Sequence, residues 1–318
     1  MEWVAIIGGL VLLIVGAELI VRFGSRLAGR LGIPPLIIGL TIVSIGTSAP
    51  ELAVGIDSAV AGEGSLAIGN IAGTNLVNLL LILGLSALLL PLPLTLQTLR
   101  LDLPTMGAVA VLLLATCVDG VLSTFEGVLL IGVAIAYTFG LIRAARREGP
   151  EVVAEYAHGF ESPPRGRGSI LIPVILLLAG IGIVILGAEW LVDGAVRLAE
   201  AAGISSAVIG LTIVAIGTSA PELVTAIIST VRGDRDIAIG NLIGSSTYNL
   251  TFILGAAVLA APIDVEPTLV LVDLPVMIGA TFLIGALMLS GRTLSRVEGG
   301  VMVAAYALYL TSVLVTRT

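Results

Sequence analysis

Long apolar runs recur from end to end of this chain, and they limit it to one kind of structure. Of its 318 residues, 57% are hydrophobic and 12% are charged, about half the charged share of an average soluble domain. A run of about 20 apolar residues can cross the hydrocarbon core of a bilayer as a helix. In lipid the backbone amides must be paired within the segment itself, which excludes open sheets and irregular chain. The sequence therefore predicts an all-α polytopic membrane protein.

Turn residues and charges divide these runs into ten predicted transmembrane helices. The first is expected to be a retained span, since its arginines follow the apolar run instead of preceding it as in a cleaved leader. Between the fifth and sixth runs lies a polar stretch that contains the single histidine, His158, which we expect to be solvated. The predicted helices are 3–23, 33–61, 66–90, 101–118, 124–145, 169–192, 204–231, 236–261, 270–290 and 296–315.

The arginines, which supply all of the basic charge, predict an orientation. If the N-terminus lies outside, thirteen of the fifteen fall at cytoplasmic helix ends and loops, and only Arg197 and Arg317 fall outside. Arginine and lysine are enriched on the cytoplasmic side of membrane proteins. We therefore expect a multi-pass protein of the cell (plasma) membrane with both termini outside and the central linker in the cytoplasm.

The second half of the chain repeats the first at a constant offset of 171 residues. Gly39–Leu52 and Gly210–Leu223 are identical at thirteen of fourteen positions, and only Ser44 against Ala215 differs. An ungapped offset that holds over several spans indicates an internal duplication. Further pairs at this offset are Glu18 and Glu189, Asn70 and Asn241, Asn78 and Asn249, and Asp102 and Asp273.

The duplication predicts two five-helix repeats of opposite orientation. The first repeat is 1–142, the linker is 143–168 and the second repeat is 169–318, with the most similar parts at 33–90 and 204–261. Because five is odd, the second repeat enters the membrane in the opposite sense to the first. Inverted repeats with discontinuous helices are typical of secondary transporters, whose substrate site lies at the repeat interface.

Each half carries the segment GTSAPE inside an apolar run. Gly46 and Pro50 flank polar residues within the predicted helix 33–61. Proline removes a backbone donor and clashes with the preceding turn, so this helix should kink or unwind there. Unwound backbone at membrane depth is tolerated only beside protein or a polar cavity. The pattern therefore predicts a broken helix beside a polar site, repeated around Pro221.

The polar residues of these motifs offer only oxygen and amide groups, with two carboxylates, Glu51 and Glu222. Hard cations such as Ca²⁺ bind six to eight oxygens in flexible geometry. The absence of cysteine and histidine from the motifs argues against zinc or copper and against the nucleophile and base that an enzyme needs. We expect a cation-binding site that carries negative charge rather than an enzyme active site. A cation channel and an intramembrane enzyme are less favoured hypotheses.

Small residues in the same motifs have a second interpretation. Glycine at membrane helix interfaces lets backbones approach closely. For Gly39, Gly69, Gly73 and their counterparts in the second half, we expect helix packing rather than ion binding.

These motifs resemble the α-repeats of the sodium/calcium exchanger family, within the calcium/cation antiporter superfamily, in a minimal form of prokaryotic type. GTSAPE matches the first signature of the family, and GNIAGTN..N and GNLIGSS..N match the second. The resemblance implies exchange of Ca²⁺ for Na⁺ by alternating access, with the first and sixth helices sliding across the core. It implies no cofactor, and we expect no nucleic acid and no obligatory protein partner beside the ions and the lipid bilayer.

Transferred by position, the resemblance implies a set of ion ligands. Backbone carbonyls of Ser44 and Ala215 would add to the side chains where the helices unwind. The side-chain ligands would be Thr47, Ser48, Glu51, Thr74 and Asn78 in the first half and Thr218, Ser219, Glu222, Ser245 and Asn249 in the second.

The chain departs from the family pattern at three places. Asn249 stands where many sodium/calcium exchangers have aspartate, and Ser246 stands where an amide is usual. The short linker has no room for calcium-sensing domains. The alternative that stays open is a cation antiporter of the same fold that is coupled to H⁺ or also requires K⁺.

Overall fold

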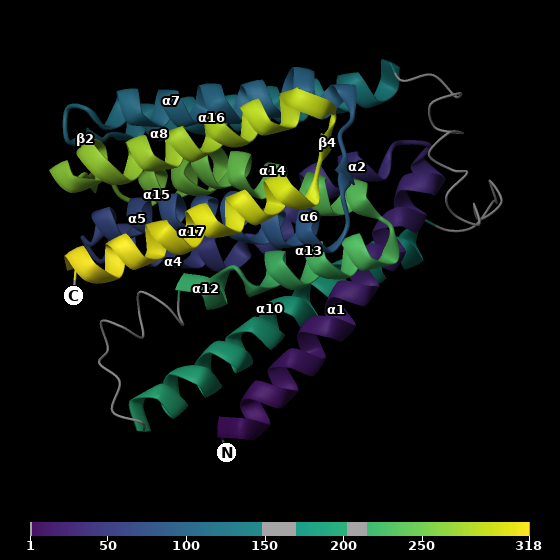
Figure 1. The fold of residues 1–318 in the computed structure, drawn as a ribbon. Coiled ribbons are helices and arrows are strands. Elements are labelled where there is room, and N and C mark those ends of the chain that lie inside the picture. Colours follow the sequence, from purple (N-terminus) through teal and green to yellow (C-terminus); the bar gives the residue numbers. More distant parts are fainter. Residues whose placement is uncertain (1, 148–169, 202–214, 318) are drawn as a thin grey trace.

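The computed structural model describes residues 2–147, 170–201 and 215–317, which are almost entirely helical (Figure 1). Most of the predicted linker and His158 lie outside the described residues, as does the first part of the predicted helix 204–231. The all-α prediction is confirmed, and helical segments lie in each of the ten predicted ranges. The helices of the first half, with π-helical turns labelled η, are α1 (Glu2–Leu31), α2 (Pro35–Ile38), η1 (Gly39–Val43), α3 (Ser44–Thr47), α4 (Ala49–Val60), α5 (Gly64–Leu76), η2 (Val77–Ile82), α6 (Leu83–Leu89), η3 (Thr98–Asp102), α7 (Leu103–Cys117) and α8 (Thr124–Arg147).

The second half repeats this order where it is described. Its helices are α10 (Leu171–Ala201), α12 (Ala215–Thr218), α13 (Ala220–Arg232), α14 (Arg235–Tyr248), η5 (Asn249–Ile253), α15 (Leu254–Ala260), η6 (Leu269–Asp273), α16 (Leu274–Gly291) and α17 (Arg296–Arg317). By length and composition, seven helices of the described residues could cross a membrane, and the bent pair α2–α4 would make an eighth. These spans agree with a polytopic membrane protein, while the full count of ten stays a prediction.

The second predicted span is broken at Ser48. The segments on either side, Pro35–Thr47 and Ala49–Val60, are bent by 44°. Ser48 leaves helical geometry, with φ −83° and ψ 14°, and Pro50 falls in the first turn of α4, where its missing amide donor has no intrahelical partner to lose. Ser219 has nearly the same angles, φ −84° and ψ 6°, between α12 and α13. The predicted kink is confirmed in the first half, and the helix of the second half is interrupted at the equivalent residue.

Two glycine pairs hold α1 against α10. A Cβ atom on Gly9 would lie 2.7 Å from the carbonyl oxygen of Gly187, and one on Gly16 would lie 2.8 Å from that of Gly180. The two helices lie side by side at one edge of the bundle (Figure 1). The absence of side chains at these positions therefore permits direct backbone contact.

Short strands join the two halves, a feature that the sequence analysis did not predict. β1 (Leu92–Pro93) pairs with β4 (Thr293–Leu294), and β2 (Val121–Leu122) pairs with β3 (Ile263–Asp264), both antiparallel. In Figure 1, β2 and β4 lie at opposite ends of the bundle. Two-residue strands carry no periodic pattern, so nothing in the sequence marks them.

Replacing Gly187 by alanine tests the glycine contact. The new Cβ atom would lie 2.8 Å from the Leu13 amide nitrogen and 2.9 Å from the Gly9 carbonyl oxygen. We expect Gly187→Ala to lower the free energy of unfolding by about 1–3 kcal/mol, seen as a lower melting temperature of the purified protein. Gly182→Ala on the same helix meets nothing within 4 Å and should leave the melting temperature unchanged. Equal effects of the two substitutions would contradict this account of the interface.

Candidate functional site

The predicted polar residues of both halves converge in the interior of the bundle. They come from the break between α3 and α4, from α13, from the junction of α5 with η2, and from the junction of α14 with η5. Hydrogen bonds cross directly between the halves, from Ser48 to Glu222 and from Thr47 to Asn241. The two repeats therefore share a single site.

Glu222 is held by hydroxyls from two elements. The Ser48 hydroxyl donates to its Oε1 at 3.2 Å, and the Ser245 hydroxyl lies 3.5 Å from the same oxygen. The carboxylate is fully buried, and its Oε2 has no hydrogen-bond partner among the described residues. One oxygen is therefore positioned by the protein, and the other remains open to a ligand.

Glu51 is buried without such support. Neither of its carboxylate oxygens has a hydrogen-bond partner among the described residues, and Ser219, the counterpart of Ser48, also has an unpartnered hydroxyl. Glu51 and Glu222 interact electrostatically, and two ionised carboxylates repel each other. Buried carboxylates without partners are rare in proteins, so this pair requires a compensating charge.

Two asparagines stand at π-helical turns that contact the helices of the carboxylates, η2 against α13 and η5 against α4. Asn78 is the second residue of η2 and Asn249 the first residue of η5. Both are fully buried, and neither the oxygen nor the nitrogen of either amide has a partner among the described residues. π-turns inside α-helices are frequent at functional sites. Thr74, one turn before Asn78, is also buried.

The broken helix of the first half is anchored to α14. The Ser44 hydroxyl lies 3.0 Å from the backbone oxygen of Asn241, and the Thr47 hydroxyl donates to the Asn241 side-chain oxygen at 3.1 Å. The carbonyl of Ser44 accepts the Ser48 amide at 3.1 Å and lies 3.3 Å from the Ser245 hydroxyl. A role of this carbonyl as an ion ligand therefore stays a prediction.

The remaining predicted ligands lie at the second break. Thr218 ends α12 and is partly buried, next to the fully buried Ser219. Ala215 is the first residue of α12. The structure therefore places the predicted residues of both halves at equivalent points on their helices.

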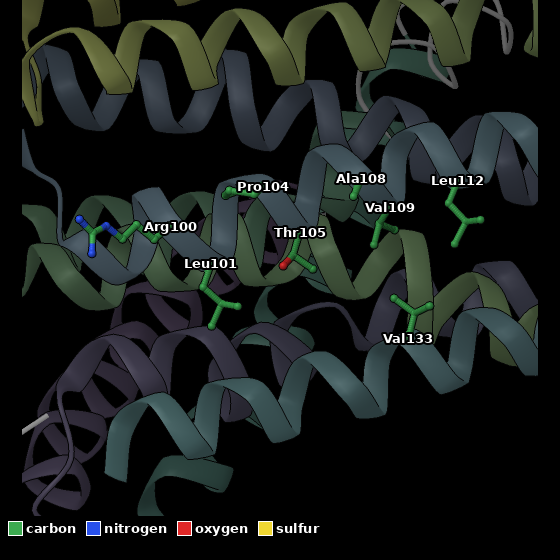
Figure 2. A pocket seen from close by; sticks show the side chains of 8 residues that line it. All are labelled: Arg100, Leu101, Pro104, Thr105, Ala108, Val109, Leu112 and Val133. Atoms are coloured by element: carbon green, nitrogen blue, oxygen red, sulfur yellow. The ribbon is translucent and has the colours of Figure 1, made fainter. Parts of the chain in front are cut away.

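A cavity of about 390 Å³ lies elsewhere, between α7 and α8 (Figure 2). Apart from Arg100 and Thr105 its lining is apolar, and none of the predicted ion ligands contributes to it. This cavity is not the cation site. Among the described residues no three histidine, cysteine or acidic side chains come together, so the buried site depends on two carboxylates.

The whole architecture has known relatives. Residues 1–143 and 172–315 match the family model described as sodium/calcium exchanger protein. The chain belongs to this family. It therefore lies among multi-pass membrane proteins.

Several relatives of this family member cover most of its length. The sodium/calcium exchanger MaX1 of Methanosarcina acetivorans is 31% identical over 95% of both chains. The inner membrane protein YrbG of Escherichia coli is 38% identical over 86% of this chain and 84% of its own. The solved sodium–calcium exchanger NCX_Mj, in a crystal soaked with Na⁺ and no Ca²⁺, superposes with a TM-score of 0.84, at 28% identity and with 98% of each chain covered.

The sequence analysis of this family member missed Asn241 as part of the site. Asn241 and its counterpart Asn70 are repeated at the same offset, which could have marked them. The ligand set implied by the family resemblance does not include them. The packing role expected for glycines is seen at Gly39, where a Cβ atom would lie 2.9 Å from the Ile237 carbonyl oxygen, and it is wrong for Gly73, which has nothing within 4 Å.

The contrast between Gly244 and its counterpart Gly73 gives a test of the anchor. A Cβ atom on Gly244 would overlap the Ser44 hydroxyl and lie 2.9 Å from Leu40 Cα. We expect Gly244→Ala to lower the free energy of unfolding by about 1–3 kcal/mol and to separate the broken helix from α14. Thermal unfolding should show the loss, while Gly73→Ala should melt like the wild type. A larger loss for Gly73→Ala would contradict the assigned contacts.

Proposed function

We propose that this protein is a secondary active antiporter that exchanges Ca²⁺ for Na⁺ across the cell membrane by alternating access. The observation that carries the proposal is the pair Glu51 and Glu222, one carboxylate from each half, both fully buried and with three of their four carboxylate oxygens unpartnered among the described residues. The names of MaX1 and NCX_Mj as sodium/calcium exchangers support it. Relatives that match the chain over nearly its full length do not favour coupling to H⁺ or a requirement for K⁺.

The donor chemistry suits these two cations. Ca²⁺ prefers carboxylate, carbonyl and hydroxyl oxygens and tolerates irregular geometry. One Ca²⁺ would neutralise both carboxylates, and Na⁺ ions could do the same at the same oxygens. The proposed side-chain ligands are Thr47, Ser48, Glu51, Thr74, Asn78, Thr218, Ser219, Glu222, Ser245 and Asn249, with the carbonyls of Ser44 and Ala215 in addition.

Obligatory exchange follows from the electrostatics of this pair. A bare carboxylate near the bilayer centre costs about 2.5–3.5 kcal/mol by insertion scales and more by simulation. Two of them that repel each other make reorientation of the empty site unfavourable. Reorientation is therefore favourable only when Ca²⁺ or Na⁺ is bound, and the two ions cross in opposite directions.

The fold proposed for this activity is ten spans in two inverted repeats, 1–142 and 169–318, with the linker 143–168 between them. The strand pairs support it, because Leu92 and Ile263 are equivalent by the offset, and the two pairings lie at opposite ends of the bundle (Figure 1). A two-fold axis that exchanges these two ends would run perpendicular to the helices. Such an axis would place one half upside down relative to the other. The arginine distribution supports termini outside and a cytoplasmic linker.

Neutralising one carboxylate tests the proposal. Glu51→Gln or Glu222→Gln leaves a divalent ion with one compensating charge, and removing one partner of a buried charge pair costs about 2 kcal/mol or more. We expect Ca²⁺ affinity to fall about 30-fold or more and Ca²⁺ uptake into proteoliposomes to be lost.

Asp57→Asn is the matched control for this experiment. It removes the same charge from the same helix, but Asp57 is exposed and should leave uptake intact. Near wild-type uptake by either glutamine variant would refute the assignment of Glu51 and Glu222.

A further inference from the structure

A buried carboxylate lies outside the cation site, at the start of α7. Asp102 is the last residue of η3 and is fully buried. Its neighbours Leu101 and Pro104 line the apolar cavity of Figure 2, but Asp102 does not. The span that contains it is Thr98–Cys117, so this carboxyl group lies about one helical turn inside the hydrophobic segment.

Only one oxygen of Asp102 has a partner. The Tyr137 hydroxyl donates to Oδ1 at 3.2 Å, while Oδ2 has no partner among the described residues. Gln97, five residues earlier, is 8% exposed, and its side-chain amide lies close enough to interact with Asp102, although neither of its polar atoms has hydrogen-bond geometry to a partner in the described part of the chain. A proton on Oδ2 would allow Asp102 to donate a hydrogen bond to an acceptor such as the Gln97 amide oxygen.

Among the described residues, no positive charge forms an ion pair with Asp102. On its own element Arg100 is exposed and forms no salt bridge with it. The ionisable groups that interact with Asp102 from α8 and α14 are the phenols Tyr137 and Tyr248, and α16 has no ionisable side chain. An unpaired carboxylate within a transmembrane segment is unfavourable by several kcal/mol, so the neutral acid fits this environment.

A contact chain joins this group to the cation site. The Tyr137 ring packs against the Tyr248 ring with 5.8 Å between centroids, and the hydroxyls of Thr138 and Tyr248 share a hydrogen bond of 2.7 Å. Tyr248 ends α14 and directly precedes Asn249, which begins η5. Two aromatic side chains therefore connect Asp102 to the residue that precedes Asn249.

The connection exists in only one half of the duplicated chain. Asp273 is equivalent to Asp102 by the offset of 171 residues. Tyr309 is equivalent to Tyr137 by an offset of 172, because one extra residue precedes α17, but Val77 stands where the second half has Tyr248. Valine has no hydroxyl to share and no ring to stack. Each half therefore has the acidic residue, but only Asp102 has aromatic side chains that connect it to a helix next to the proposed cation site.

We propose that Asp102 is a proton-binding site, separate from the cation site, whose occupancy is passed through Tyr137 and Tyr248 to the residues around Asn249. The reaction is the reversible addition of one proton from water to the carboxylate, with no other bond changed. Loss of that proton creates an uncompensated anion and disturbs the contact of α7 and α8 with α14. Exchange then depends on pH even when Na⁺ and Ca²⁺ saturate the cation site. The effect on exchange rests on the proposed function, whereas proton binding itself does not.

Infrared spectroscopy of the full-length protein in lipid tests proton binding directly. The carbonyl stretch of a protonated carboxylic acid should be present with Ca²⁺ bound, when Glu51 and Glu222 are expected to be ionised. Asp102→Asn is nearly isosteric and should lose one such band. Identical carboxylic acid bands in wild type and Asp102→Asn, with or without Ca²⁺, would overturn the proposal.

The pH profile of exchange at saturating ion concentrations tests the connection. Asp102→Asn should lose one step of the wild-type profile. Tyr248→Phe should keep the infrared band but lose the same step, because only the shared hydrogen bond with Thr138 is removed. Asp273→Asn is the matched control and should keep the step. A wild-type profile in Asp102→Asn, or a retained step in Tyr248→Phe, would overturn the proposed link. If the wild type exchanges no ions, the proposed function fails and the infrared band alone decides on the proton site.

Discussion

The repulsion between two buried carboxylates is the constraint on which the rest of this structure depends. Glu51 and Glu222 are both fully buried and interact electrostatically, and no basic side chain pairs with either of them in the described part of the chain. Lipid and packed protein screen charge poorly, so the pair is stable only with bound cations or protons. The helix breaks at Ser48 and Ser219, the hydroxyls and the amides all surround this pair. In the proposed function they supply the oxygens that a cation needs in place of its water.

The two halves are equivalent in fold but not in detail. Glu222 is held by hydroxyls from Ser48 and Ser245, whereas Glu51 has no such contact among the described residues. Ser44 anchors its broken helix to α14, and the equivalent Ala215 has no hydroxyl to do the same. An antiporter with identical halves would have equal energies when open to either side. Because the halves differ in these contacts, the two orientations are not related by exact symmetry, and their energies are not required to be equal.

Much of the fold could be predicted from local sequence, because lipid makes helical segments obligatory and proline marks a break. The bend between Thr47 and Ala49 lies where Pro50 predicts it. The first helix extends to Leu31, beyond the predicted end at 23, since arginines that follow a span can continue the helix into the headgroup region. What could not be predicted depends on which helices meet. The Asn241 contacts, the pairing of Leu92 with Leu294 and the stacking of Tyr137 on Tyr248 are all long-range, and an apolar pattern does not encode them.

The central claim is that Ca²⁺ and Na⁺ compete for Glu51 and Glu222 and cross in opposite directions. The most direct measurement is uptake of radioactive Ca²⁺ into proteoliposomes loaded with Na⁺, K⁺ or choline, with and without an imposed pH gradient. We expect uptake that requires internal Na⁺ and is absent with K⁺ or choline, even though Asn249 adds no charge to the proposed site. Uptake that ignores internal Na⁺ and follows the pH gradient would contradict this claim.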